Sequence, residues 1–465
     1  MTVEAKDRYR GYRGPCLALM QRLGFKVWSE VRMRTSRGEF EGLVLPRSET
    51  SDELHVVLKL GTGYNIGIRH DTVLAVEELG YREAVYQIPE KEFPKNAALP
   101  RVKLLGTGGT IASRLDYRTG AVIPAFTPGE LYGSVPELAD ICNLETEKLF
   151  SIFSENMGPE QYLVLAEKIG DAVRAGYDGV VVGHGTDTMH HTAAALSFMV
   201  QDAPVPIVMV GSQRSSDRPS SDAARNLLAA TWTAAHGPIA EVMVCMFGPT
   251  SDRYDLLHRG TRVRKMHSST RSTFRTVGDI PLAMVEDGSL TPLTQDWRRR
   301  RTDRAVTVRA AYDERVTLLY YYPGMHPDVM DALVEKGYRG IVIAGTGLGH
   351  VNRKIYPALA RARDAGVLVY MTLQTLWGFV QMQVYETGRE ILQLGVVPLA
   401  NMLPEVAFVK LGWALGVHPR DPVAVRDLML TPIAGDMTER EPHDGYLIFQ
   451  GGVPEMNEFL TKVWR

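Results

Sequence analysis

The chain has 465 residues, 45% of them hydrophobic and 23% charged, and its formal net charge is -2. This length and composition allow sizeable buried cores and predict roughly three domains. The small net charge gives no whole-protein attraction to nucleic acid or membrane, although it does not exclude a local basic face. No stretch approaches the roughly 18 uncharged apolar residues of a membrane helix, and the first residues lack the apolar segment of a signal peptide. We therefore expect a soluble cytoplasmic protein.

The three cysteines, Cys16, Cys142 and Cys245, are scattered and show no CxxC spacing. Neither a disulfide framework nor a zinc site is indicated. A reducing cytoplasm fits this pattern, and we expect no metal in this chain.

Residues 24–78 alternate between apolar and polar side chains in short runs separated by Gly, Ser, Asp and Asn. Such period-two runs predict strands and hairpins, here at 26–34, 41–45, 55–60 and 65–68. Few strands in few residues favour a small barrel or barrel-like sheet. A module of this kind either binds a ligand or only braces a dimer or a neighbouring subunit. We assign residues 1–95 to this domain and its linker, because 88–96 is rich in proline and charge.

An α/β pattern follows in residues 96–285. Apolar runs predict strands at 102–105, 179–182, 207–210 and 242–246, and helices at 159–175, after Thr186, and at 222–235. Because strands and helices alternate, we expect a parallel sheet with helices on both faces.

Residues 286–314 show no strong periodicity and read as a linker. Their run of four arginines, Arg298 to Arg301, is typical of a solvated loop more often than of an RNA contact. Residues 315–465 then resume the alternation as a smaller α/β domain, with strands predicted at 317–321, 340–344 and 367–370 and helices at 328–336 and 355–364. The glycine clusters at 106–109 and 345–349 lack the further residues of a dinucleotide or ATP motif, so we reject NAD and ATP at both.

Two turns carry polar side chains after buried strands. One strand ends in Gly183-His184-Gly185-Thr186-Asp187, and an earlier one ends in Gly106-Thr107-Gly108-Gly109-Thr110. Ligands bind at the carboxyl ends of strands in an open α/β sheet. Hydroxyls, a carboxylate and glycine-exposed N–H groups there indicate a nucleophile and an oxyanion site for acyl chemistry. The alternative is ordinary helix caps and tight turns, with Thr186 or Asp187 as the cap.

The segments TGGTIAS at 107–113 and HGTDTM at 184–189 resemble the two motifs of the bacterial-type L-asparaginase family, in that family's order. The resemblance runs from about residue 100 to the C-terminus. It implies Thr110 as the acyl-accepting nucleophile and a second catalytic cluster of Thr186, Asp187 and a lysine, for which Lys265 is the best candidate beside Arg264. It further implies substrate contacts by Tyr117 on a mobile lid and by Ser154 and Glu155.

The group that deprotonates Thr110 stays open. A lysine acts as a base only when it is uncharged, and a neighbouring carboxylate favours the charged form, so Lys265 either takes the proton or orients Thr186 and Asp187. Tyr117 is the other candidate. Without the resemblance, Ser154 and Glu155 read as an N-cap pair before the helix at 159–175, and both roles are compatible. His350 stands where the family places an asparagine, which argues against ordinary asparagine specificity.

With residues 59–68 and their module preceding an asparaginase-like body, nearly the whole chain resembles the D-subunit family of archaeal glutamyl-tRNA(Gln) amidotransferases. This implies that the chain releases ammonia from glutamine, or asparagine, through a Thr110 acyl-enzyme. A partner protein, the E subunit of such a complex, would hold ATP and Mg and receive the ammonia for Glu-tRNA(Gln), within a heterotetramer built on a homodimer of this chain. No cofactor is expected here. The alternatives are a free-standing cytoplasmic L-asparaginase and a catalytically silent tRNA- or protein-binding subunit.

Overall fold

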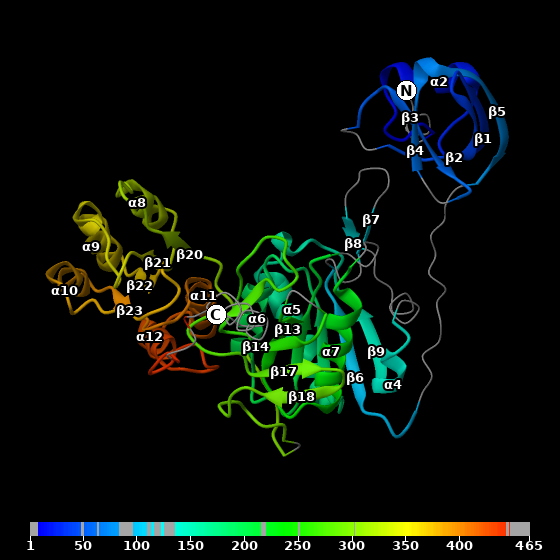
Figure 1. Ribbon diagram of the computed structural model, residues 1–465. Helices are drawn as coiled ribbons and strands as arrows, with labels where there is room; N and C mark the ends of the chain where they lie inside the picture. The colour runs from blue at the N-terminus through cyan, green and yellow to red at the C-terminus, as the bar shows by residue number, and fades with distance from the viewer. Residues whose placement is uncertain are drawn as a thin grey trace, which may run out of the picture. The chain divides into compact units, whose positions relative to one another are not determined.

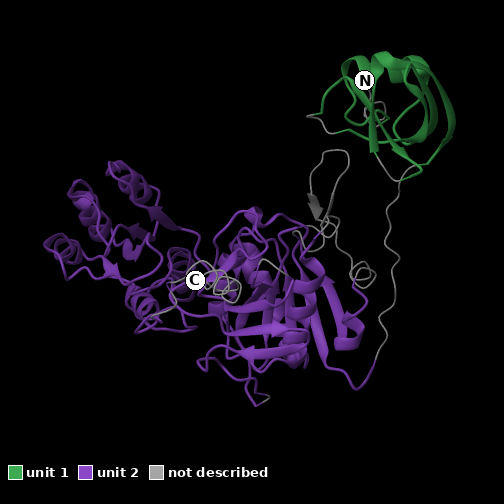
Figure 2. Ribbon diagram, viewed as in Figure 1, with its two compact units in different colours: residues 1–89, 113–123 green, residues 90–112, 124–465 purple. Residues whose placement is uncertain are grey.

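The chain forms two compact units, residues 1–89 with 113–123 and residues 90–112 with 124–465, which are coloured separately in Figure 2. Within the described residues, no helix is long and apolar enough to cross a membrane. The computed structural model describes residues 8–47, 51–62, 65–82, 96–108, 113–115, 122–124, 135–214, 220–249, 252–301, 303–442 and 446.

The first unit contains an antiparallel sheet with strand order β4-β3-β2-β1-β5, drawn in blue in Figure 1. Its elements are α2 (Gly14–Leu23), β1 (Ser29–Thr35), β2 (Gly38–Val44), β3 (His55–Leu60), β4 (Asn65–Arg69), η1 (His70–Thr72) and β5 (Val73–Tyr81). The four strands predicted from the alternation are confirmed, whereas α2 and the separate strand β5 were not predicted.

Strand β1 shows why this sheet forms. Val31 and Met33 are fully buried and pack with Met20 of α2, whereas Arg32 between them is partly exposed. The Arg32 guanidinium forms ion pairs of 2.5 Å and 2.9 Å with Glu41 and Glu77 on the two neighbouring strands. The period-two pattern therefore separates an apolar face from a charged face.

The second unit is built on an eight-stranded mixed sheet with order β18-β17-β14-β13-β12-β10-β6-β9. The four predicted strands, β6, β10, β12 and β13, are parallel, and β9, which was not predicted, is also parallel to β6. Strands β14, β17 and β18 extend the sheet in antiparallel fashion. The strands are β6 (Arg101–Gly106), β9 (Asn143–Lys148), β10 (Gly179–Gly183), β12 (Ile207–Val210), β13 (Val242–Phe247), β14 (Asp255–Arg259), β17 (Ala283–Glu286) and β18 (Ser289–Pro292).

Helices cover both faces of this sheet, as predicted. Val180 and Val182 of β10 face the core cluster under α5 and α6, and Val181 faces the other cluster, under α7. The uninterrupted apolar run of β10 follows from burial on both faces. The helices are α4 (Leu138–Ile141), α5 (Pro159–Arg174), α6 (Met189–Met199) and α7 (Ala223–His236).

A four-stranded parallel sheet, β20-β21-β22-β23, forms the smaller α/β region. Its elements are β20 (Val316–Tyr320), α8 (Asp328–Glu335), β21 (Gly340–Gly345), η4 (Arg353–Ile355), α9 (Tyr356–Asp364), β22 (Leu368–Leu373), α10 (Glu386–Gln393), β23 (Val397–Pro398), α11 (Pro404–Val417) and α12 (Pro422–Leu430). Helix α11 is buried almost all round, and Trp413 stacks on Phe198 of α6 with ring centroids 5.7 Å apart. The two α/β regions therefore share a core.

Short elements complete the described chain: β7 (Ser113–Leu115), β8 (Val122–Pro124), η3 (Ser154–Asn156), β11 (Val200–Gln201), β15 (Val263–Lys265), β16 (Phe274–Thr276) and β19 (Thr307–Val308). β11 pairs with β19, so part of the segment that reads as a linker is ordered against the larger sheet domain.

The arginine run is not simply a solvated loop, and that interpretation was wrong at two positions. The Arg298 side chain donates to the Ile433 carbonyl at 2.5 Å. Arg300 is half-buried and donates to the carbonyls of Ala235 and Asp178. Composition did not reveal these contacts because the acceptors are main-chain oxygens far away in the sequence.

Candidate active site

Two turns meet at the carboxyl edge of the larger sheet. β6 and β10 are parallel with Gly106 opposite Gly183, so the chain leaves both strands at the same level. The main-chain N–H and the side-chain hydroxyl of Thr107 both donate to the Gly183 carbonyl at 3.0 Å. The start of the first polar turn is therefore bonded to the start of the second.

Lys265 reaches the second turn from β15. Its Nζ atom donates to Thr186 Oγ1 at 3.0 Å and to Asp187 Oδ1 at 2.6 Å. The Lys265 side chain is 9% exposed and that of Asp187 is 67% exposed, so the ammonium is sheltered while the carboxylate faces solvent. The neighbouring Arg264 instead bonds to Glu405. The structure thus brings together Thr186, Asp187 and Lys265, the lysine that the sequence favoured over its neighbour Arg264.

The N-cap of α6 is Thr188, so the alternative in which Thr186 or Asp187 caps this helix was wrong. Both side chains bond to Lys265. The Thr188 hydroxyl donates to the Ser154 carbonyl at 2.6 Å rather than capping the helix.

Ser154 lies directly against this turn. A methyl group placed on Gly185 would come within 2.8 Å of the Ser154 Cβ atom, so only glycine allows this approach. Ser154 is buried and Glu155 is exposed, within the short helix η3. The cap of α5 is Gly158, whose N–H donates to the Gln161 side chain, so the interpretation of Ser154 and Glu155 as an N-cap pair was wrong.

His184 packs beneath the turn, between Gly185 and Thr192 of α6. The sequence analysis did not name it as a site residue. Its ring is fully buried, with Nδ1 at 2.6 Å from the Gly185 carbonyl and Nε2 at 2.9 Å from Thr192 Oγ1. Burial lowers its pKa to about 4, so the imidazole is neutral near pH 7. Its position as the first residue of the HGTDTM segment could have identified it from the sequence.

The loop after β12 backs the same turn. A methyl group on Gly211 would come within 2.6 Å of the His184 carbonyl and 3.0 Å of Thr186 Cγ2. The Asn226 side chain donates to the Gly211 carbonyl at 2.9 Å and to Asp222. Asn226 and Asp222 therefore fix the position of the loop that packs behind the site. The sequence analysis missed this role because both residues lie at the start of a helix, where polar side chains are common.

Thr110 and Tyr117 lie outside the described residues. Of the predicted site residues that the structure describes, Ser154, Thr186, Asp187 and Lys265 form one cluster, and Glu155 is next to it in the chain. His350 lies in the loop after β21, where its Nδ1 atom is 3.3 Å from Thr387 Oγ1 and its ring contacts Tyr385. The cluster combines a hydroxyl, a carboxylate and an amine, which can move or hold a proton at the mouth of the turn.

Three family comparisons cover most of the chain. Residues 101–298 match "Asparaginase, N-terminal", residues 315–429 match "Glutaminase/Asparaginase C-terminal domain", and residues 25–79 match "GatD N-terminal domain". A solved structure, the thermostable L-asparaginase from Thermococcus kodakarensis, is 32% identical with a TM-score of 0.64, covering 73% of this chain and 99% of that one. L-asparaginase I from Vibrio cholerae is 26% identical with a TM-score of 0.64, covering 73% and 99%. Fold and site therefore define an asparaginase-like protein with an additional N-terminal domain.

Curated relatives extend over that additional domain. The D subunit of glutamyl-tRNA(Gln) amidotransferase from Thermococcus kodakarensis is 49% identical over 437 residues, covering 92% of this chain and 98% of the relative. The D subunit from Thermofilum pendens is 45% identical over 447 residues, covering 94% and 98%. The chain belongs to the family of glutamyl-tRNA(Gln) amidotransferase D subunits. The resemblance seen in the sequence is confirmed, and the free-standing asparaginase and the silent binding protein are disfavoured.

Proposed function

We propose that this chain hydrolyses the side-chain amide of glutamine, or of asparagine, and delivers the ammonia to a partner, the E subunit, for the amidation of Glu-tRNA(Gln). The observation that carries the proposal is the bonding of the Lys265 amine to both Thr186 and Asp187 at the carboxyl edge of the sheet. The relatives named as amidotransferase subunits support it.

In the proposed reaction the Thr110 oxygen attacks the amide carbon of the substrate. The oxygen–carbon bond forms, the carbon–nitrogen bond then breaks, and ammonia leaves after gaining the proton released by the hydroxyl. Water next attacks the Thr110 ester, which regenerates the hydroxyl and releases glutamate or aspartate. Backbone N–H groups of the glycine turns would stabilise the oxyanion that forms in each step.

The remaining site residues have separate proposed roles. Thr186, Asp187 and Lys265 form a proton-holding group that orients the attacking hydroxyl or water. Ser154 and Glu155 hold the α-carboxylate and α-ammonium groups of the substrate, and Asp187 assists with the ammonium because its side chain is 67% exposed. Tyr117, which lies outside the described residues, is proposed to contact the substrate as well, because the family resemblance implies this role.

The partner would carry ATP, Mg and the charged tRNA, so this chain needs no cofactor or metal for the hydrolytic step. We propose that two copies of this chain and two of the partner assemble in the cytoplasm. Glutamine hydrolysis should therefore rise when the partner and Glu-tRNA(Gln) are added together. An unchanged rate would favour a free-standing L-asparaginase.

The catalytic cluster is tested by Lys265→Met, with Thr110→Ala as the reference for loss of the nucleophile. We expect kcat for glutamine hydrolysis to fall by about 100-fold or more in both, with stability retained, because a transition-state contact is removed. Lys168→Met is the matched control, since Lys168 Nζ lies at the same 2.6 Å from the carboxylate of Glu147 away from the cluster. Full activity in Lys265→Met would refute the assigned roles.

A further inference from the structure

Lys265 is carried by a short strand outside the main sheets. β15 has three residues and pairs only with β16 among the described strands. Two strands alone restrain a backbone weakly, so the placement of the Lys265 amine depends on further contacts. Those contacts come from the residues one and three positions before it, Arg264 and Arg262.

Arg262 ties the entry of β15 to the smaller α/β region. Its side chain is fully buried and donates to the Gly435 carbonyl at 2.9 Å and to the Asn401 carbonyl and side chain at 2.9 Å and 3.0 Å. The Val277 N–H in turn donates to the Arg262 carbonyl at 2.8 Å. Every bond of the guanidinium thus runs to residues more than 130 positions away in the chain.

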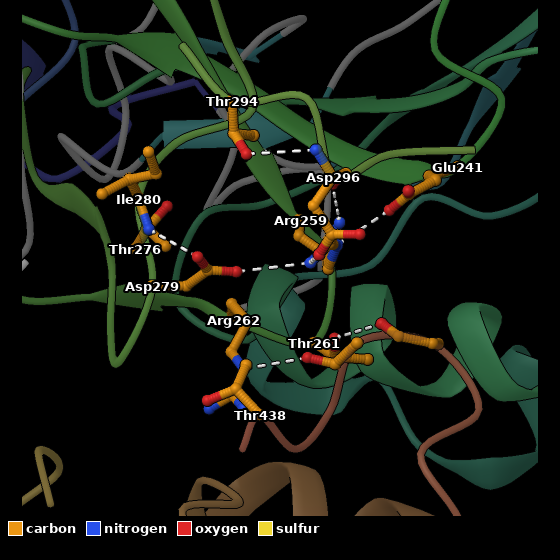
Figure 3. Close-up of polar contacts among 12 residues, drawn as sticks. Glu241, Arg259, Thr261, Arg262, Thr276, Asp279, Ile280, Thr294, Asp296 and Thr438 are labelled. Carbon is orange, nitrogen blue, oxygen red and sulfur yellow. Dashed lines mark hydrogen bonds and ion pairs between the residues drawn. The ribbon is translucent and has the colours of Figure 1, made fainter. Parts of the chain in front are cut away.

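The segment that includes Gly435 is itself firmly held. Thr261, next to Arg262 in Figure 3, donates to the Ala434 carbonyl at 2.7 Å. Arg259 in the same view forms ion pairs with Glu241, Asp279 and Asp296 at 2.9, 3.3 and 3.5 Å. Thr261 and Arg259 thus connect the chain just before Arg262 to other parts of the second unit, and Arg264 provides the next described polar side-chain contact toward Lys265.

Arg264 bonds to a single described carboxylate, that of Glu405. The distance from Arg264 Nη1 to Glu405 Oε2 is 2.7 Å, and the two side chains are 32% and 4% exposed. Glu405 lies in the first turn of α11, where the helix dipole favours a negative charge. Its other oxygen, Oε1, is buried and has no hydrogen-bond partner in the described part of the chain. Burying a carboxylate with one unpaired oxygen costs free energy, so the contact with Arg264 must offset part of that cost.

Among the described residues, two histidines of α6 also interact with Arg264. His190 of α6 is buried and its neighbour His191 is partly buried, and desolvation together with the Arg264 charge lowers the pKa of both. Lys265 also contributes to the positive potential at His190. Glu405 is thus the described carboxylate that pairs with Arg264; burial raises the pKa of this carboxyl, and the Arg264 charge opposes the rise.

We propose that Glu405 is a positioning residue, which holds Arg264 and thereby keeps the Lys265 amine within hydrogen-bonding distance of Thr186 and Asp187. This inference rests on the proposed hydrolysis of glutamine or asparagine. It makes the smaller α/β region part of the catalytic apparatus, although Glu405 itself touches none of the three residues in the described contacts.

The first test is Glu405→Gln in the full chain, with glutamine and asparagine as substrates. Gln keeps the size of the side chain and removes the charge. We expect kcat to fall about tenfold while KM stays within about twofold, because the affected group acts on the chemical step and not on substrate binding. Partial recovery of kcat is expected in Glu405→Asp, which restores the charge at a shorter reach.

The double variant Arg264→Met/Glu405→Leu separates positioning from stability. Replacing a buried ion pair by apolar side chains is often neutral or stabilising, so the melting temperature should match or exceed that of the wild type. If Glu405 positions Lys265, kcat stays low in this stable protein. If kcat recovers together with the melting temperature, Glu405 has a structural role only and the proposal is wrong. This variant decides the question even if Glu405→Gln fails to fold.

Asp313→Asn is the matched control. Asp313 is also a largely buried carboxylate paired with an arginine, Arg339, and its side chain is 12% exposed. No described contact joins that pair to β15, so kcat should not change. A wild-type chain without hydrolytic activity would contradict the proposed function, whereas an active wild type with wild-type kcat in Glu405→Gln would contradict only the role of Glu405.

Discussion

Two buried aspartates near the start of α7 differ in how their charge is satisfied. Asp222 accepts hydrogen bonds from the N–H groups of Gln213 and Arg214 and from the Asn226 side chain. Asp255 on β14 is 1% exposed, and its oxygens have no hydrogen-bond donor among the described residues. Arg225 approaches Asp255 only to 3.6 Å. Burial therefore outweighs the arginine and raises the pKa of Asp255 to about 7.

Asp255 should make the protein less stable as the pH rises. The unfolded carboxyl ionises near its ordinary pKa of 3.8, whereas the folded one keeps its proton up to about pH 7. The stabilising contribution is thus fully present below pH 3.8 and is lost as the pH rises through 7, with a total of roughly 4 kcal/mol at most. Asp255→Asn should flatten this dependence and raise the melting temperature at pH 8 relative to the wild type.

Thermal unfolding between pH 5 and pH 8 measures this effect. The neighbouring charges at Asp222, Asp252 and Arg225 are unchanged in Asp255→Asn, so the difference between the two pH profiles isolates Asp255. Parallel profiles for wild type and variant would show that Asp255 is already ionised when folded.

At the scale of secondary structure, the arginine run 298–301 links segments that are far apart in the sequence. Arg300 donates to the Ala235 carbonyl at 2.8 Å, at the end of α7, and to the Asp178 carbonyl at 2.5 Å, just before β10. Arg301 is exposed, and its side chain forms a described ion pair only with the nearby Asp303. The side chain of Arg300 therefore connects distant segments, whereas that of its neighbour Arg301 makes only a local contact.

Arg300→Gln should destabilise the protein by about 1 to 3 kcal/mol, because partly buried carbonyls lose their donors. Arg301→Gln is the matched substitution, for which we expect a change within about 0.5 kcal/mol. Denaturant unfolding of both variants checks the contrast. Equal stability in the two variants, combined with weaker tRNA binding in Arg300→Gln, would instead favour a nucleic-acid contact.

At the scale of the whole molecule, the N-terminal unit has a core of its own. Val31, Met33 and Leu58 pack with α2 in one cluster, which is distinct from the three clusters that support the catalytic sheet and the smaller α/β region. The contacts among Ser154, Thr186, Asp187 and Lys265 all lie within the second unit. We therefore expect hydrolysis not to require residues 1–96.

Removal of residues 1–96 tests this separation. We expect the shortened chain to fold and to retain kcat for glutamine hydrolysis within about threefold, because its cores are independent. Stimulation by the partner and Glu-tRNA(Gln) should be lost. The measurement is ammonia release with and without these components, and retained stimulation would assign the domain to bracing alone.

Much of the fold was predictable because its signals are local. Uninterrupted apolar runs such as the one in β10 predicted parallel strands, and alternation predicted the N-terminal sheet. Strands β9, β14, β17 and β18 were missed, because polar or charged residues leave each of them without an uninterrupted run of four apolar side chains. The cap of α6 was also misjudged, since Thr186, Asp187 and Thr188 all suit that position and only their tertiary partners distinguish them.

The amino-acid sequence alone determined the fold class, the family and the two turns at which the site lies, because strand patterns and the TGGTIAS and HGTDTM segments are properties of neighbouring residues. The sequence favoured Lys265 over Arg264, but only the tertiary structure showed that the Lys265 amine bonds to Thr186 and Asp187 and that Arg264 bonds to Glu405. The physical reason is that successive residues of a strand point to opposite faces, and what each face meets depends on segments 79 and 141 residues away in the chain.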